Sequence, residues 1–585
     1  MTSRLNDCLP PARIPVLAKF ALFASLASAV LVFGAPNPLR AAEKAAVGPS
    51  IKQSLSPELP ALFDRQLQLI KERRPEWLRQ AERSLPKLHV AVKRPVSLVK
   101  VEKDAASFQG WKTVDAGKAD TVLNRPMLPG DSFILDFGEH LTGYFKFALR
   151  RFDIAVDAPV RLALIFAEMP AELGEPFDPY PGSLTRSWLQ DEIVNIDDVP
   201  GETRLPRRYA FRYAKVTVVA ASRYGKFGFA DISLEAVTSA DEAQLRPFLA
   251  RTPADAALDR VSLRTLRDCM QTVFEDGPKR DRRLWLGDLR LQALANYRSF
   301  RNYELVKRSL YLLAGTADDQ GLVATCAFER PEPMRGGNAI LDYTALLAPT
   351  VLEYLEASGD RQTPLNLWPL VLKQLDFTLE PVNTEGLFVP PKGWWLFVDW
   401  HRSLDKQAPE HAIVLLGLRA TQTLAEKLGR QDEARFIPEA IHRMENAARQ
   451  RLWDETQGLF VSGPKREVSY ASQAWMVLAG VPSPEQARRA MQGVLRQPEA
   501  VKPVTPYLHH YVVEALFAAG LAEAANKHLH DYWGTMIQKG ADTFWEVFVP
   551  GDDFASPYKS HLMNSYCHAW SCTPVYFLRA PAAGK

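Results

Sequence analysis

Two stretches of this 585-residue sequence place carboxylates where they could act chemically. The first, residues 275–288, holds four acidic and four basic side chains in 14 positions, with Trp285 among them. Its Gly and Pro residues mark a loop between helical runs. Such a loop can be a plain solvated connector. An aromatic ring among alternating charges can also hold a sugar, whose apolar face stacks on the ring while its hydroxyls are hydrogen-bonded.

The second stretch, residues 540–548, centres on Glu546. Its neighbours Phe544, Trp545, Val547 and Phe548 are all apolar or aromatic. In such surroundings a carboxylate either pairs with a cation or has its pKa raised by burial, and both occur at functional sites. The alternative is a glutamate on the exposed side of a short strand or at the start of a helix.

Two further stretches, residues 394–401 and 564–571, combine aromatic rings with a few polar groups. Their notable residues are Trp394, Trp395, Asp399, Trp400, His401, His568 and Trp570. Each stretch could be packed core, since tryptophans are mostly buried. The four stretches together nevertheless hold six of the 13 tryptophans, and this mixture of rings and carboxylates suits a pyranose better than a nucleotide or a metal ion.

These stretches must be positioned by two kinds of structure. Between residues 90 and 240 the sequence has short runs of alternating apolar and polar residues, the period of a half-buried strand. The runs are 133–137, 144–149, 160–166, 213–219 and 227–234. Several such runs separated by turn residues predict a β-sandwich.

From about residue 245 the apolar residues follow a helical period instead. The expected helical runs are 256–274, 289–314, 340–358, 364–379, 409–428, 432–452, 469–480, 506–520 and 521–537. A Gly-Leu-Val or Gly-Leu-Phe signature recurs at Gly321, Gly386 and Gly458, each time between helical runs. The spacing between these three glycines fits pairs of helices with their connections. The aromatic and charged residues in the connections favour a closed helical barrel, with a site at one mouth, over an α-solenoid.

The composition limits which classes of partner the protein could bind. With 47% hydrophobic and 24% charged residues the chain resembles ordinary globular proteins. Residues 1–41 carry four basic residues and one acidic residue, which accounts for the whole net charge of +3, so nothing favours nucleic acid as a partner. The sequence has no phosphate-binding glycine loop and no His and Cys set at metal-ligand spacing, and we expect no cofactor and no metal.

The N-terminus has the order of a secretory signal. Basic residues precede an apolar run that begins at Phe20, and the small residues Ala41 and Ala42 follow it. A membrane anchor is the alternative, but Gly34 and two prolines shorten the apolar run. We expect residues 1–42 to be a cleaved signal peptide, the protein to be secreted or periplasmic, and no integral membrane domain to remain after cleavage.

Two motifs resemble the active-site signatures of bacterial α-L-rhamnosidases of glycoside hydrolase family 78: Asp276-Gly-Pro-Lys-Arg280-Asp281 with Trp285-Leu-Gly287-Asp288, and Asp542-Thr-Phe-Trp545-Glu546. The resemblance covers about residues 130–578. It implies a multidomain fold, in which an N-terminal β-sandwich is followed by an (α/α)6 barrel, a six-hairpin toroid. The expected domains are residues 50–245, with an N-terminal helix and the sandwich, and the catalytic barrel of residues 246–578.

The resemblance also implies an exo-acting hydrolase that removes terminal α-L-rhamnose from glycans or glycosides with inversion. It makes Glu546 the general base and Asp281 the general acid. The expected substrate-binding residues are Asp276, Arg280, Trp285, Asp288, Trp545 and His568, to which the tryptophan-rich stretch adds Asp399 and Trp400. The partner is then an oligosaccharide, a polysaccharide or another glycoside.

The first signature differs from the family at the position of the general acid. Family members usually have Glu directly after the Arg or one residue later, whereas this sequence has Asp281 and Arg282 at those two positions. Asp is one methylene shorter and needs a shift of ~1 Å to reach the same oxygen, and misplacement on that scale can cost about 10²-fold in rate. Asp288 is the alternative acid. Another sugar specificity, or a carbohydrate-binding protein without catalysis, are the competing functions.

Overall fold

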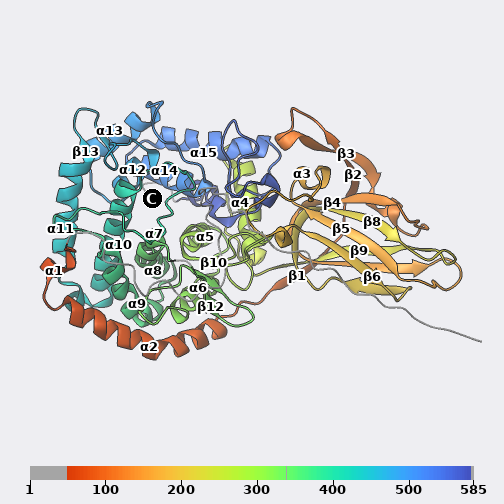
Figure 1. The fold of residues 1–585 in the computed structure, drawn as a ribbon, viewed down its shortest axis with the longest axis horizontal. Helices are drawn as coiled ribbons and strands as arrows, with labels where there is room; N and C mark the ends of the chain where they lie inside the picture. Colours follow the sequence, from red (N-terminus) through yellow and green to blue (C-terminus); the bar gives the residue numbers. More distant parts are fainter. Residues whose placement is uncertain (1–48, 338, 581–585) are drawn as a thin grey trace, which may run out of the picture. The chain divides into compact units, whose positions relative to one another are not determined.

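The computed structural model describes residues 49–337 and 339–580. The expected signal peptide lies outside these residues. No helix within the described part is long and apolar enough to span a membrane. The chain forms a sheet-rich N-terminal part and a helical part that follows it (Figure 1).

The sheet-rich part has the alternating burial that the sequence predicts. Its strands are β1 (His89–Lys93), β2 (Ser97–Lys103), β3 (Trp111–Lys118), β4 (Ser132–Arg151), β5 (Val160–Ala167), β6 (Asp191–Ile196), β7 (Gly201–Arg204), β8 (Tyr209–Ala220) and β9 (Phe227–Thr238). The first two predicted runs are parts of the one long strand β4, and the other three lie in β5, β8 and β9. The inward-facing side chains of these strands form one apolar core.

Strand β4 changes partners along its length within one nine-stranded sheet. Residues 132–136 pair with β8 and β2, and residues 143–151 pair with β9 and β7. The register with β8 breaks after Asp136 and resumes at Leu141, and Gly138 takes a φ of +79° in the break. A break of this kind bends a strand and redirects its side chains. The break also turns His140 out of the sheet toward the helical part.

The helical part closes into a ring. Its helices are α4 (Pro253–Cys269), α5 (Leu286–Arg298), α6 (Tyr303–Gly315), α7 (Leu341–Ala345), α8 (Leu347–Ser358), α9 (Gln362–Thr378), α10 (Gln407–Leu428), α11 (Ile437–Ala447), α12 (Tyr470–Leu478), α13 (Pro484–Leu495), α14 (Pro506–Ala518), α15 (Ala522–Gln538) and α16 (Pro574–Leu578). Helices α5, α8, α10, α12 and α14 each pack on the next, and residues 569–578 contact both α14 and α5. This closure is the expected barrel and excludes the solenoid.

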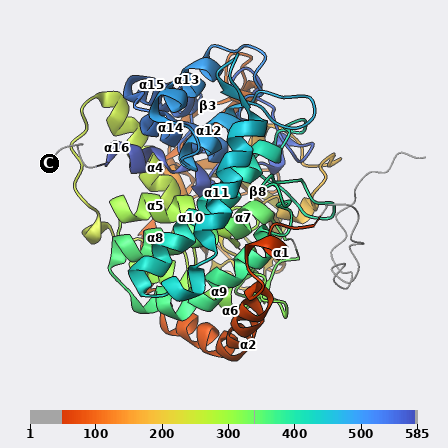
Figure 2. The same ribbon diagram turned by 90° about the vertical axis from the view of Figure 1, so that its left-hand side faces the viewer.

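Several elements differ from the sequence predictions. The run 289–314 is two helices, because Asn302 caps α6 after a break at residues 299–302. Helix α13 was not predicted. Helix α2 (Leu59–Arg83), which the prediction grouped with the sandwich, packs instead on α6 and α9 of the barrel (Figure 1, Figure 2).

The recurring glycine signature marks a turn before the barrel connections. Gly321, Gly386 and Gly458 all have positive φ, between +66° and +86°. At Gly386 a side chain could not fit, since a Cβ would lie 2.6 Å from the carbonyl oxygen of Arg443. The repeat is therefore a backbone requirement at equivalent turns of successive helix pairs.

Candidate functional site

One pocket at the mouth of the barrel collects most of the candidate residues. Its walls are Asp276, Asp281, Trp285, Asp288, Ile340, Tyr343, Trp395, Phe397, Trp400, Glu546, Tyr558, His568 and Trp570. They come from four separate segments, residues 276–288, 340–343, 395–400 and 546–570, so the ring of helices is what brings them together. The lining combines carboxylates with aromatic rings, which is the composition expected for a sugar site.

The first loop is held by buried contacts to the segment around residue 564. A Cβ on Gly277 would lie 2.6 Å from the hydroxyl oxygen of Ser565, so only glycine permits this approach. Lys279 is fully buried, and its ammonium group pairs with Glu172 at 2.5 Å and donates to the carbonyl of Leu562 at 3.0 Å. These residues position the loop and do not face the pocket.

A tight turn then presents Asp281 to the pocket. Asp281 and Arg282 both have left-handed backbone angles, with φ of +60° and +53°. Such angles are uncommon outside glycine, are better tolerated by Asp than by most residues, and cluster at functional sites. The Arg282 side chain turns away and donates to the carbonyls of Pro278 at 2.9 Å and Arg208 at 2.6 Å. Arg282 therefore braces the turn.

Glu546 is buried among donors. The hydroxyl of Tyr558 donates to it at 2.5 Å, the backbone N–H of Ser565 donates at 3.0 Å, and the Arg280 guanidinium contacts it directly. Burial alone would raise the pKa of Glu546, but the charge of Arg280 and these hydrogen bonds outweigh burial and hold the pKa below its usual value. Glu546 is thus ionised near neutral pH.

Two other carboxyl groups in the pocket have the opposite tendency. Burial raises the pKa of Asp276 well above its usual value, and the charges of Asp281 and Asp288 add to the effect. Burial raises the pKa of Asp288 in the same direction, with a further contribution from Glu546. The site therefore holds one carboxylate that favours ionisation beside carboxyl groups that favour protonation.

Three buried polar atoms of the pocket have no hydrogen-bond partner among the described residues. They are Oδ1 of Asp288, Nδ1 of His568 and Nε1 of Trp400. The Asp288 and His568 atoms lie 3.9 Å apart, too far for a hydrogen bond but close enough for one hydroxyl to contact both. Burial lowers the pKa of His568 to about 4, so its ring is neutral. Unsatisfied groups of this kind are suited to a polyhydroxylated ligand.

Comparison with known proteins fits this geometry. The N-terminal domain of the glycosyl hydrolase family 78 α-rhamnosidases matches residues 95–236, and the bacterial α-L-rhamnosidase six-hairpin glycosidase domain matches residues 251–581. The chain belongs to glycoside hydrolase family 78. A search of curated proteins gives no match.

Solved structures agree with the assignment to family 78. A rhamnosidase from Klebsiella oxytoca with rhamnose bound is 41% identical, with a TM-score of 0.83 over 86% of this chain and 98% of that one. A family 78 rhamnosidase of Bacillus sp. GL1 shares the fold at 23% identity, with a TM-score of 0.66 over 80% of this chain and 49% of that one. The protein is therefore a glycoside hydrolase, as the motifs predicted.

Seven of the predicted residues of this family 78 hydrolase lie in the pocket: Asp276, Asp281, Trp285, Asp288, Trp400, Glu546 and His568. Arg280 does not line it, because its guanidinium is buried between Glu546, the carbonyl of Met563 and the ring of Tyr558. Its predicted contact with the sugar is replaced by a contact with the predicted base.

Two residues predicted to bind substrate do not line the pocket. Trp545 is 1% exposed and stacks on Phe108 at 4.3 Å between ring centroids, outside the pocket. Asp399 accepts hydrogen bonds from the backbone of Val504 and from Thr505, the residue that caps α14. Trp545 is a core residue, and Asp399 anchors the tryptophan-rich loop to a helix.

The structure adds pocket residues that carry no clear signal in the sequence. Tyr343, Phe397 and Tyr558 line the pocket, and Trp395 and Trp570 were noticed only as members of aromatic stretches. Tyr343 lies within a helix, where an aromatic side chain is indistinguishable from core. Tyr558 follows Glu546 by 12 positions in an irregular segment, and only its hydrogen bond to Glu546 shows its importance.

Proposed function

We propose that the protein is an exo-acting, inverting α-L-rhamnosidase in which Glu546 is the general base and Asp281 the general acid. An inverting hydrolase needs one carboxylate that activates water and one carboxylic acid that protonates the leaving oxygen. The observation that carries the proposal is the buried Glu546, which contacts the Arg280 guanidinium and the Tyr558 hydroxyl. It lies in a pocket where polar atoms of Asp288, His568 and Trp400 have no hydrogen-bond partner among the described residues. The rhamnose bound to the 41% identical relative supports the choice of sugar.

The contacts of Glu546 favour its role as base. Arg280 and Tyr558 keep it charged and fix its orientation, so it can accept a proton from a water molecule without a change of geometry. A carboxylate held in its ionised form would be a poor proton donor at the same pH. The acid must therefore come from another carboxyl group of the pocket.

Exposure separates the two candidates for the acid. The side chain of Asp281 is 18% exposed and that of Asp288 is 4% exposed. In an exo-acting enzyme the terminal sugar lies deep and the leaving group points outward, so the scissile oxygen lies toward the opening. The greater exposure of Asp281 supports its assignment to that oxygen, and the position of Asp288 beside His568 and Tyr343 supports a contact with a sugar hydroxyl.

Arg280 lies beside both proposed catalytic carboxyl groups. Its planar guanidinium contacts Glu546 through one nitrogen and lies 3.5 Å from Asp281 through another. Inversion is proposed from the membership of family 78. Inverting enzymes need carboxyl groups separated by roughly 6.5–9.5 Å, which leaves room for the attacking water.

We also propose that the protein is exported and acts on a rhamnose-containing glycan or glycoside outside the cytoplasm. The basis is the order of residues 1–42, in which basic, apolar and small residues follow one another. Sequencing the N-terminus of the protein from the cell exterior or periplasm tests this. A chain that keeps Met1 in the cytoplasm would contradict it.

The decisive experiment compares two α-L-rhamnosides that differ in their leaving group, 4-nitrophenyl and an alkyl alcohol. Nitrophenolate leaves with little protonation, so Asp281→Asn should cost far more on the alkyl rhamnoside than on the nitrophenyl one, while Glu546→Gln should lose both activities. Asp288→Asn, the matched control, should affect both substrates equally. NMR of the first product should show β-rhamnose. Equal losses for Asp281→Asn would exclude it as the acid, and α-rhamnose would exclude inversion.

A further inference from the structure

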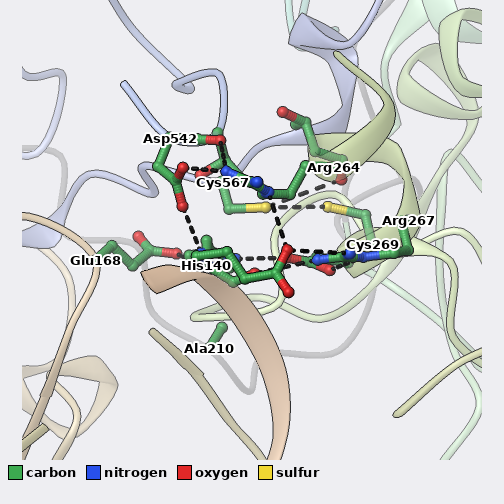
Figure 3. Close-up of polar contacts among 12 residues, drawn as sticks. His140, Glu168, Ala210, Arg264, Arg267, Cys269, Asp542 and Cys567 are labelled. Carbon is green, nitrogen blue, oxygen red and sulfur yellow. Dashed lines mark hydrogen bonds and ion pairs between the residues drawn. The ribbon is translucent and has the colours of Figure 1, made fainter. Parts of the chain in front are cut away.

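A second cluster of reactive side chains lies behind the pocket, where the sandwich meets the barrel. Cys269, the last residue of α4, and Cys567, next to His568, are both fully buried, and their sulfur atoms lie 3.9 Å apart (Figure 3). His140 reaches the cluster from the break in β4. The proposed hydrolysis uses none of these three residues.

The surroundings of His140 favour its charged form. One ring nitrogen lies 2.7 Å from a carboxylate oxygen of Asp268 and the other lies 3.1 Å from one of Glu168. Burial alone would lower the pKa of His140, but Cys567 and the two carboxylates outweigh it and raise the pKa well above the usual value. A protonated imidazole beside a thiol stabilises the thiolate.

The two thiols differ accordingly. Burial raises the pKa of Cys269 well above that of a free thiol. At Cys567 the hydrogen bond from Cys269 and the charge of His140 outweigh burial, and the pKa is lowered. Such a pair combines a nucleophilic thiolate with a neighbouring thiol that can resolve the product.

A metal ion fits the cluster less well. His140, Asp268 and Cys567 offer ligand atoms within 4.8 Å of one another. Both ring nitrogens of His140 already contact carboxylates, however, and the Arg267 guanidinium donates to Asp268 at 2.8 Å. Nearby Arg264 is held by its own ion pairs with Asp542 and Glu139 (Figure 3). A divalent cation would have to displace the contacts of His140 and Asp268.

We propose that Cys269 and Cys567 are a redox pair that forms a reversible disulfide, which joins the segment before the Asp281 loop to the segment that carries His568. The sulfur atoms must approach by about 2 Å to reach bonding distance, a change that rotation of the two side chains can supply. The link would tie together two segments 298 residues apart that both carry walls of the pocket.

The oxidant is a disulfide such as glutathione disulfide. The Cys567 thiolate attacks one of its sulfur atoms, the S–S bond of the oxidant breaks, and one glutathione leaves and takes up a proton. Cys269 then loses its proton and attacks the Cys567 sulfur, and the second glutathione leaves. The two cysteines lose two electrons and glutathione disulfide gains them, together with one proton from Cys269 and one from solvent. Because both thiols are buried, exchange occurs during folding or on local opening.

The test refolds the full chain in glutathione buffers of graded redox ratio and alkylates the remaining thiols in denaturant. Peptide mass mapping should show Cys269 and Cys567 linked in oxidising buffer and both alkylated after dithiothreitol. Cys326→Ser, a change at another buried cysteine, should leave the link intact, whereas Cys269→Ser and Cys567→Ser should abolish it. The linked protein should lose rhamnosidase activity more slowly on heating than the reduced protein. This difference should vanish in the variant that combines Cys269→Ser and Cys567→Ser.

His140→Gln examines the role of the imidazole. It removes the charge that stabilises the reduced thiolate, so the disulfide should persist in more reducing buffer than in the wild type. Complete alkylation of Cys269 and Cys567 in oxidising buffer would overturn the proposal, and so would a link between other cysteines. One zinc ion per freshly purified chain, whose removal by a chelator exposes Cys567 to alkylation, would instead make the cluster a metal site.

Discussion

The hydrogen bond from Tyr558 to Glu546 allows a quantitative test of the proposed base. The Tyr558 hydroxyl donates to Oε1 at 2.5 Å, and the pKa of this phenol is raised well above its usual value by burial and by Glu546, so it remains a donor throughout the working pH range. Tyr558→Phe removes the donor and keeps the ring that packs against Arg280. The change therefore acts mainly on the electrostatics of Glu546.

The expected size follows from the strength of the bond. Hydrogen bonds to charged groups contribute about 1.5–3 kcal/mol. This donor helps to hold the pKa of Glu546 below its usual value, so its loss raises that pKa and moves the acid limb of the pH–rate profile to higher pH. On that limb the rate follows the ionised fraction, so it should fall by up to about 10- to 150-fold, while the rate above the limb changes little.

The assay is kcat/KM for 4-nitrophenyl α-L-rhamnoside as a function of pH. Tyr224→Phe, at a tyrosine that is 71% exposed, is the matched control and should leave the profile unchanged. A uniform loss at every pH would mean that Tyr558 only shapes the pocket. An acid limb that does not move would show that Glu546 does not set it, which would refute its assignment as the base.

Three further changes probe the framework of the site. Lys279→Met leaves Glu172 buried and unpaired and should lower the free energy of unfolding by about 3–5 kcal/mol, as measured by denaturant titration. Gly277→Ala should cost about 1–3 kcal/mol and lower kcat, and Ser565→Ala in the same chain should restore part of both losses, since it removes the clashing hydroxyl. Trp545→Phe should lower the thermal midpoint of unfolding but leave KM for the rhamnoside unchanged. A raised KM would show that Trp545 contributes to substrate binding.

Much of the fold can be predicted from the spacing of apolar residues, because burial on one face of a strand or helix imposes that spacing. The alternating residues of β4 and β5 face a core, and the helical runs after residue 250 bury one side in the barrel. Helix α13 was missed although its four buried residues follow the helical period and Ser483 and Gln486 form a capping box at its start. The elements that α2 packs on could not be predicted, since an amphipathic pattern shows which face of a helix is buried but not which element covers that face.

The residues of the site that belong to short sequence motifs could be predicted. Asp276, Asp281 and Asp288 lie close in sequence and their backbone requirements are local, so the motif locates all three. Trp545 and Glu546 are adjacent, and a sequence cannot show that one faces the pocket while the other packs on Phe108. Asp399 shows the same limit, because in a sequence a carboxylate that accepts hydrogen bonds from the N-cap residue of a distant helix resembles one that binds a sugar.

The charges of the first loop show what the sandwich contributes to catalysis. Glu275 accepts from Arg208 at 2.6 Å, Lys279 pairs with Glu172, and both partners belong to the sheet-rich part. Three of the eight charged residues of this loop, Glu275, Lys279 and Arg282, thus fasten the loop to the sandwich. Because the turn at Asp281 lies between these contacts, its unusual backbone is held from outside the barrel. The sandwich is therefore a structural part of the active site, and its removal should misplace the acid even if the barrel still folds.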